Sequence, residues 1–197
     1  LGPEHAETAQ SLNNLAGLLQ DMGDLYGARP YCERSLEISE KALGPDHPHT
    51  ACSLNNLASL LAEMGDLRAA RPLFERALSI CERSLAPDHP DTAICLLQLA
   101  TLLRTMGDLR AAGPLYARAL AIREKTLGPD HPDMASSLNG MAMLFWDQGD
   151  LPAARRFLER TLAIREIALG SEHPATVVSL NNLAGLLQAM GDLPAAL

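Results

Sequence analysis

Apolar side chains recur along the chain at the spacing of an α-helix that is buried on two sides. In the first segment, two stripes about 110° apart on a helical projection hold Leu12, Leu15, Ala16 and Leu19 and then Ser11, Leu18 and Met22. The remaining arc is more polar and holds Gln10, Asn13, Gly17, Gln20 and Asp21. This pattern predicts a helix that packs against two neighbours and leaves the third arc open.

The whole pattern returns at a fixed step of 42 residues. The tetrapeptide Met-Gly-Asp-Leu begins at Met22, Met64, Met106 and Met190, and Gln148-Gly-Asp-Leu fills the remaining slot. Because no insertion disturbs this register, we expect one continuous domain over residues 1–197. Its repeats are predicted at 1–42, 43–84, 85–126 and 127–168, with a partial repeat at 169–197.

Each repeat is expected to form two helices. In the second repeat, the first helix should begin at Pro48, a favoured first helical residue, and end near Glu63. Gly65 can then adopt a left-handed conformation and Asp66 can cap a second helix that runs from about residue 67 to about residue 85. Glycine also stands at three of the junctions between repeats, but Ala86 replaces it at one, where we expect no left-handed cap.

Prolines recur within the second helix of the repeats. Pro30, Pro72 and Pro114 fall about two turns inside it, where proline removes a backbone hydrogen bond, so we expect a kink or an irregular first turn. Pro152 and Pro194 fall in the first turn, where proline is tolerated.

A two-helix unit cannot bury its apolar face alone, so successive units must stack. The recurring motifs are Leu54-Asn55-Asn56-Leu57-Ala58, Gly65-Asp66 and Gly44-Pro45-Asp46-His47-Pro48. In these motifs the chain resembles tetratricopeptide repeats, and its 42-residue step resembles the kinesin light chain type. The resemblance covers the whole chain. It implies an all-α fold, a right-handed α-solenoid of stacked antiparallel helix pairs with about 4.7 repeats. It also implies a concave groove, lined by the first helix of each repeat, that binds extended peptides or short helices.

The open arc supplies the candidate residues for this groove, because it varies between repeats while the packing stripes hardly change. The predicted peptide-binding residues are Asn13, Gln20, Asn55, Arg104, Asn139, Met143, Trp146, Asn181 and Gln188. A side-chain amide can both donate to and accept from a peptide backbone. Alternatively, the four asparagines bond to neighbouring helices or to water. The second asparagines of the repeats (Asn14, Asn56, Asn182) fall nearer a packing stripe and favour a structural hydrogen bond.

Trp146, the single tryptophan, is either an interaction hot spot or a packing residue of an irregular fourth repeat. Arg104 could pair with an acidic ligand residue, but Asp21, Glu63 and Asp147 lie on the same arc. The predicted groove is therefore mixed in charge.

Composition narrows the function further. Leu (37) and Ala (30) make up about a third of the 197 residues and favour helices over sheets. The net charge of −8 argues against nucleic acid and against a polybasic membrane contact. No apolar run approaches the roughly 18 residues that span a bilayer. No nucleotide-binding, nucleophile or zinc motif is present, so we expect a non-enzymatic chain without a cofactor.

The cysteines and histidines do not suggest a metal site. Cys32, Cys52, Cys81 and Cys95 lack ligand-like spacing, which favours free thiols in a reducing compartment, and with no signal peptide we expect a cytoplasmic protein. The histidines at the junctions occur once per repeat, and stacked repeats lie roughly 10 Å apart, too far to share an ion. They are interpreted as turn residues, and the acids beside them as turn or cap residues.

Two functions remain open. The first is a scaffold that binds a protein or peptide ligand in the groove. The second is a structural spacer or self-assembling element of a larger signalling protein. Terminal repeats without polar caps expose their packing faces, so end-to-end or paired contacts between chains are expected.

Overall fold

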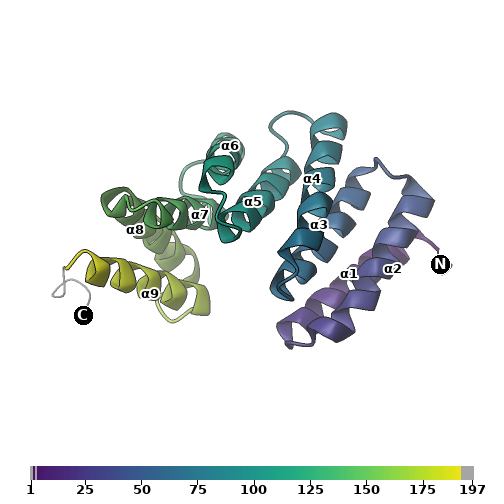
Figure 1. The fold of residues 1–197 in the computed structure, drawn as a ribbon, viewed down its shortest axis with the longest axis horizontal. Coiled ribbons are helices and arrows are strands. Elements are labelled where there is room, and N and C mark those ends of the chain that lie inside the picture. Colours follow the sequence, from purple (N-terminus) through teal and green to yellow (C-terminus); the bar gives the residue numbers. More distant parts are fainter. Residues whose placement is uncertain (1, 3, 192–197) are drawn as a thin grey trace. The chain divides into compact units, whose positions relative to one another are not determined.

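The computed structural model describes residue 2 and residues 4–191, and over these residues all regular structure is helical. The helices are α1 (Ala6–Asp21), α2 (Leu25–Leu43), α3 (Pro48–Glu63), α4 (Leu67–Ser84), α5 (Pro90–Thr105), α6 (Leu109–Leu127), α7 (Met134–Asp147), α8 (Leu151–Leu169) and α9 (Pro174–Ala189). Odd-numbered helices are the first helices of the repeats, and even-numbered helices are the second. The prediction of an all-α fold built from stacked helix pairs is confirmed (Figure 1).

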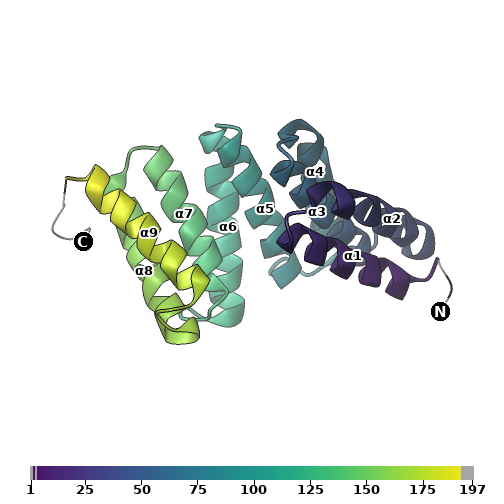
Figure 2. The same cartoon turned by 90° about the horizontal axis from the view of Figure 1, so that it is seen from below.

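The chain forms two compact units, Leu1–Leu102 (unit 1) and Leu103–Leu197 (unit 2). Within unit 1, α1 packs on α2, α2 on α3 and α3 on α4, and α1 also touches α3. Within unit 2, α6 packs on α7, α7 on α8 and α8 on α9, which Figure 2 shows side by side. Within the units, α2 and α8 therefore each contact the first helix of their own repeat and that of the next.

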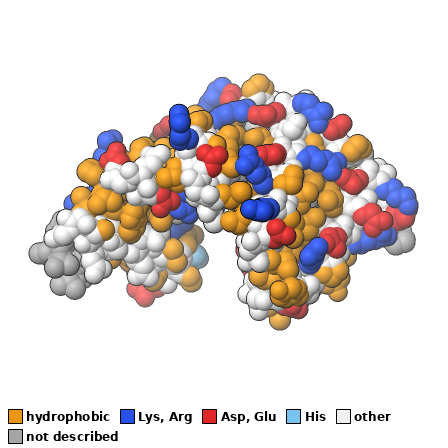
Figure 3. Space-filling model, in the orientation of Figure 1, with side chains coloured by type: hydrophobic (Ala, Val, Ile, Leu, Met, Phe, Trp, Pro, Cys, Tyr) orange, Lys and Arg blue, Asp and Glu red, His pale blue; other side chains and the backbone are white. Residues whose placement is uncertain are grey.

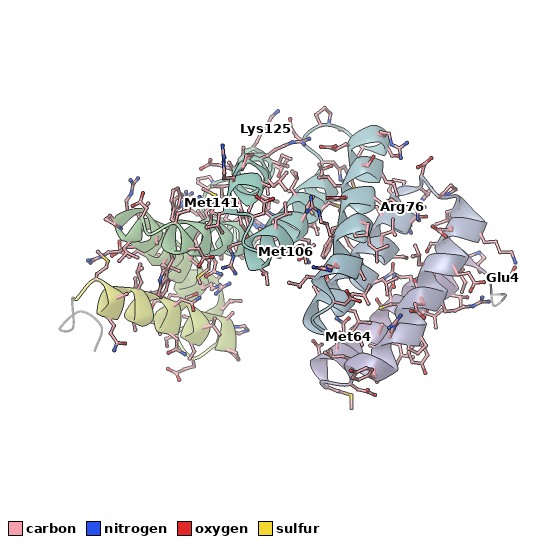
Figure 4. All side chains as sticks on the ribbon, viewed as in Figure 1. Glu4, Met64, Arg76, Met106, Lys125 and Met141 are labelled. Atoms are coloured by element: carbon pink, nitrogen blue, oxygen red, sulfur yellow. The ribbon has the colours of Figure 1, made fainter. Side chains whose placement is uncertain are left out.

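The turn between the two helices of a repeat has the predicted chemistry. Gly65 has a φ of 86°, a conformation that side chains rarely adopt. The carboxylate of Asp66 accepts from the backbone N–H of Ala69 at 3.0 Å and so caps α4. Equivalent aspartates cap the other second helices in the described part of the chain. Met64 and Met106, labelled in Figure 4, mark two of these turns.

The recurring histidines accept a backbone hydrogen bond at the start of the first helices, where His5, His47 and His173 are the N-caps. In the second repeat, His47 Nδ1 accepts from the backbone N–H of His49 at 3.2 Å, and the same bond is made by His5, His89, His131 and His173. The side chain that accepts this hydrogen bond at the start of the helix is therefore the histidine and not the acid beside it. Two of the acids beside the histidines pair with the second helix of the repeat that follows them, Glu4 with Lys41 on α2 and Asp46 with Arg83 on α4. No group of three or more metal-binding side chains occurs among the described residues.

The internal prolines do not disturb the start of the second helices. The α2 helix begins at Leu25, directly after its Asp24 cap, and continues through Pro30 to Leu43. The expectation of an irregular first turn is therefore wrong. The N–H that Pro30 lacks would have bonded to the carbonyl of Tyr26, and both residues are exposed, so water can solvate that carbonyl. Pro194 lies outside the described residues.

Small residues form the centre of each repeat. Ala58 on α3 and Ala70 on α4 are both fully buried, and alanine recurs at these two positions in the other repeats: Ala16, Ala28, Ala100, Ala112, Ala142 and Ala154. Small side chains let packed helices approach closely, while the buried ring of Tyr116 on α6 lies against Gly140 on α7 of the next repeat. No helix in the described part of the chain is long and apolar enough to cross a membrane.

The surface of unit 1 carries ion pairs beside hydrophobic side chains (Figure 3). Basic and acidic side chains lie side by side over α2 and α4 in Figure 3. Arg71 pairs with Glu75 on α4, and Arg76, labelled in Figure 4, reaches Glu40 on α2 at 2.6 Å. These exposed pairs contribute little to stability individually.

Candidate functional site

The predicted open arc lies on the first helix of each repeat, and we call it the helix-A face. Its centre is formed by two positions seven residues apart, occupied by Gln10 and Gly17 on α1 and by Cys52 and Ser59 on α3. These residues are exposed or half-buried, and an added Cβ at Gly17 would meet nothing within 4 Å. On α7 and α9 the same positions hold Ser136, Met143, Val178 and Gly185. The face is therefore open to a ligand in both units.

The asparagines at the edge of this face are engaged between repeats in unit 1. Asn13 and Asn55 are 8% and 9% exposed. The Asn13 amide donates to Ser53 Oγ at 3.3 Å, and the Asn55 amide donates to Cys95 Sγ at 3.0 Å. These bonds correspond to the structural alternative for the asparagines. Both side-chain carbonyl oxygens are buried without a hydrogen-bond partner, so neither residue reaches a ligand unless its side chain rotates.

In unit 2 the asparagines are more accessible. Asn139 is half-buried and accepts from the amide of Asn182 at 3.3 Å, while Asn181 is exposed. A structural hydrogen bond was expected of the second asparagines, and Asn182 makes one. Asn14 is exposed and accepts from the side-chain amide of Gln10 on its own helix at 3.0 Å, and Asn56 is also exposed. The exposed pair lies at the other edge of the helix-A face, so the face is one position wider than the sequence suggested.

A second set of bonds joins neighbouring first helices at the far end of the face. Gln20 donates to Glu63 at 3.3 Å in unit 1, and Arg104 pairs with Asp147 at 2.7 Å in unit 2. Burial opposes the charge of Arg104, but its bonds to Asp147 and Tyr116 outweigh this and raise its pKa. An acidic ligand residue would therefore have to compete with Asp147 for Arg104.

Trp146 combines the two roles considered for it. It is half-buried and packs against a cluster that contains Ala142, Ala154, Leu158 and Leu186. Its ring also lies close to α9, where a Cβ added at Gly185 would come within 3.3 Å of Trp146 Cη2. Met143 beside it is half-buried, and Gln188 on α9 is exposed. The ring is thus held by packing and leaves part of its surface on the helix-A face.

The sequence analysis missed a polar contact that recurs between repeats. A residue near the end of each second helix meets a residue in the first turns of the next first helix, 14 positions later. The pairs are Ser39–Ser53, Cys81–Cys95, Arg123–Ser137 and Arg165–Ser179. The signal lies in the 42-residue register, which aligns these positions at a constant spacing of 14 residues.

Comparison with known proteins agrees with this architecture. The tetratricopeptide repeat model matches residues 7–83, 51–112, 103–167 and 133–197. No curated protein matches the chain. Among solved structures, the nearly identical repeats of a kinesin light chain-like protein from Podosopora anserina are 29% identical, with a TM-score of 0.78 over 98% of this chain and 91% of that one.

Two further structures share the fold at lower identity. BtubC (BKLC) from P. vanneervenii has a TM-score of 0.81 at 24% identity, covering 97% of this chain and 76% of that one. MamA from Desulfovibrio magneticus RS-1 has a TM-score of 0.61 at 14% identity, covering 95% and 88%. The family model matches nearly the whole sequence, and the matches agree with the 42-residue repeat seen in the sequence. The chain therefore belongs to the tetratricopeptide repeat family, as an array of the kinesin light chain-like type.

Proposed function

We propose that this chain is a non-catalytic interaction scaffold that binds an extended peptide segment along its helix-A faces. Tetratricopeptide repeats generally serve as protein-interaction scaffolds, and the peptide site is the finer part of the proposal. The free thiols suit a reducing compartment, so the proposal includes a cytoplasmic location.

One observation carries this proposal: the accessible positions vary while the buried ones repeat. The alanine at the centre of the first helix is the same in α1, α3, α5 and α7. The adjacent face position changes from Gly17 to Ser59, Thr101 and Met143. Packing constrains the buried position, whereas a surface that selects ligands is free to differ from repeat to repeat.

The two faces offer different chemistry to a peptide. In unit 1 the accessible side chains on this face of α1 and α3 include amides, a hydroxyl, the Cys52 thiol and the acids Asp21 and Glu63. In unit 2 they include Met143, Val178 and the edge of Trp146, beside the exposed amide of Asn181. A peptide bound to unit 1 would therefore present polar residues, and a peptide bound to unit 2 would present at least one apolar anchor.

A peptide-display screen on the purified chain tests the proposal. Enriched peptides are then measured against Gly17→Arg, which fills open space on the face of unit 1, and Val178→Arg, which charges the face of unit 2. We expect affinity to fall at least tenfold in one or both variants. Ser79→Arg adds the same charge to the exposed surface of α4 and should leave affinity unchanged. Equal affinity in all variants would place the site elsewhere.

Self-association is the second candidate function, and exposed apolar residues on α1 favour it. Leu18 and Met22 are 57% and 72% exposed, whereas Leu60, the equivalent of Leu18 in the next repeat, is fully buried. We expect the mass measured by light scattering to rise with protein concentration, and Leu18→Arg to abolish the rise. Ile167→Arg, at an even more exposed apolar site on α8, is the control. A constant monomer mass for the unmodified chain would exclude this function.

A further inference from the structure

Two buried cysteines face each other inside unit 1. Cys81 lies near the end of α4 and Cys95 in the second turn of α5, and their sulfur atoms are 3.3 Å apart. Their side chains are 2% and 1% exposed. A disulfide needs its sulfurs about 2.05 Å apart, so a small adjustment of the two side chains would bring them to bonding distance.

The repeat register shows that this pair replaces a different contact. At the first junction, between α2 and α3, the same two positions hold Ser39 and Ser53, with their hydroxyls 3.0 Å apart. At the junctions of unit 2, an arginine donates to a serine, Arg123 to Ser137 and Arg165 to Ser179. Of these four contacts, the one between Cys81 and Cys95 is the only one in which both residues are cysteines.

The surroundings make the two thiols unequal. The hydrogen bond from Cys81 lowers the pKa of Cys95, and the amide of Asn55 lowers it further, against the opposing effect of burial. The pKa of Cys81 is raised, chiefly by its hydrogen bond to Cys95 and then by burial. Cys95 is therefore the cysteine that more readily becomes a thiolate, while Cys81 remains a protonated thiol that donates a hydrogen bond to the Cys95 sulfur.

We propose that Cys81 and Cys95 form an oxidation site, which a hydroperoxide converts into a reversible disulfide joining α4 to α5. The Cys95 thiolate attacks a peroxide oxygen, the O–O bond breaks, and after protonation water or an alcohol leaves and Cys95 carries a sulfenic acid. The sulfur of Cys81 then attacks Cys95, an S–S bond forms, and a second water leaves. With hydrogen peroxide, two thiols and one peroxide give one disulfide and two waters.

Burial determines which oxidant can take part. The pair has almost no solvent exposure, which favours a molecule as small as hydrogen peroxide over a bulky disulfide such as oxidised glutathione. Cys52 on the helix-A face is exposed and would react separately, including with other chains. Cys32 is an internal reference, because burial raises its pKa to about 11 and keeps it a thiol at neutral pH.

The test uses the full chain with Cys52→Ser, to remove the exposed thiol. The protein is treated with hydrogen peroxide, alkylated, digested and analysed by mass spectrometry without reductant. We expect the intact mass to fall by two hydrogens, a peptide that contains Cys81 joined to Cys95, alkylated Cys32, and full reversal by dithiothreitol. Peroxide treatment that leaves both cysteines alkylatable, or joins either one to Cys32, would overturn the proposal.

The chain supplies a matched control. Cys81→Ser together with Cys95→Ser recreates the Ser39–Ser53 contact, so it should fold with the same circular dichroism and lose no hydrogens to peroxide. With Cys81→Ser alone, Cys95 should stop at the sulfenic acid, which dimedone should label when the peroxide-treated chain is unfolded in its presence. With Cys95→Ser alone, Cys81 should give little dimedone adduct; strong labelling would contradict the assignment of Cys95 as the attacking sulfur.

Discussion

The first and second junctions of unit 1 share one geometry and differ in the atoms that occupy it. At the first, Ser53 Oγ lies within hydrogen-bonding distance of Asn13 Nδ2, Ser35 Oγ and Ser39 Oγ. At the second, Cys95 Sγ lies in the same place between Asn55 and Cys81. Sulfur is a weak hydrogen-bond partner but can be oxidised. The first junction is therefore held by hydrogen bonds, whereas the second can form a covalent bond.

Truncating Ser53 at the first junction or Cys95 at the second should have the largest effect on stability. Ser53→Ala leaves the buried amide of Asn13 and the hydroxyl of Ser39 without that partner, so we expect a loss of about 2 kcal/mol in the free energy of unfolding. Cys95→Ala loses mainly packing and should cost about 1 kcal/mol. Urea unfolding monitored by circular dichroism, with reductant present, measures both.

Equal losses in the two variants would contradict this difference between the junctions. Ser79→Ala, at an exposed site on α4, should change stability by less than about 0.5 kcal/mol and controls for the loss of a hydroxyl as such.

The fold could be predicted because the sequence repeats its local signals in a fixed register. The Gly65–Asp66 turn and the buried alanines each follow from residue chemistry that recurs every 42 residues. The His47 cap was predicted only as a turn residue, because histidine is an unusual N-cap and its role depends on the extended backbone before Pro48. The repeat therefore predicts where the helices begin and end, but it does not predict which residue each side chain contacts.

The candidate site was less predictable, because helical periodicity gives angles between residues and not the distance to a neighbouring helix. Asn13 and Asn14 differ by one position, yet the next repeat covers the first and leaves the second exposed. The Cys81–Cys95 contact depends on how one helix crosses the next. Only the structure shows that residues 14 positions apart meet there.

The two junctions of unit 1 also differ in backbone, and this gives the second and smaller prediction. The glycines that end α2, α6 and α8 have φ between 86° and 98° and ψ near 160°. Only glycine adopts this combination readily. At the second junction Ala86 stands in the equivalent position, and α4 ends at Ser84 with Leu85 as its C-cap, in an extended backbone conformation with φ −118° and ψ 164°. The expectation that Ala86 carries no left-handed cap is therefore confirmed.

Exchanging glycine and alanine between junctions tests whether the backbone or the side chain sets this difference. Gly128→Ala places a Cβ in open space, so its expected cost of about 1–2 kcal/mol in unfolding free energy comes from the strained backbone alone. Ala86→Gly removes no such strain and should change stability by less than about 1 kcal/mol, through added freedom of the unfolded chain. If Gly128→Ala proved neutral, the third junction would be able to adopt the extended form seen at Leu85, and sequence would then select between two interchangeable ways of joining repeats.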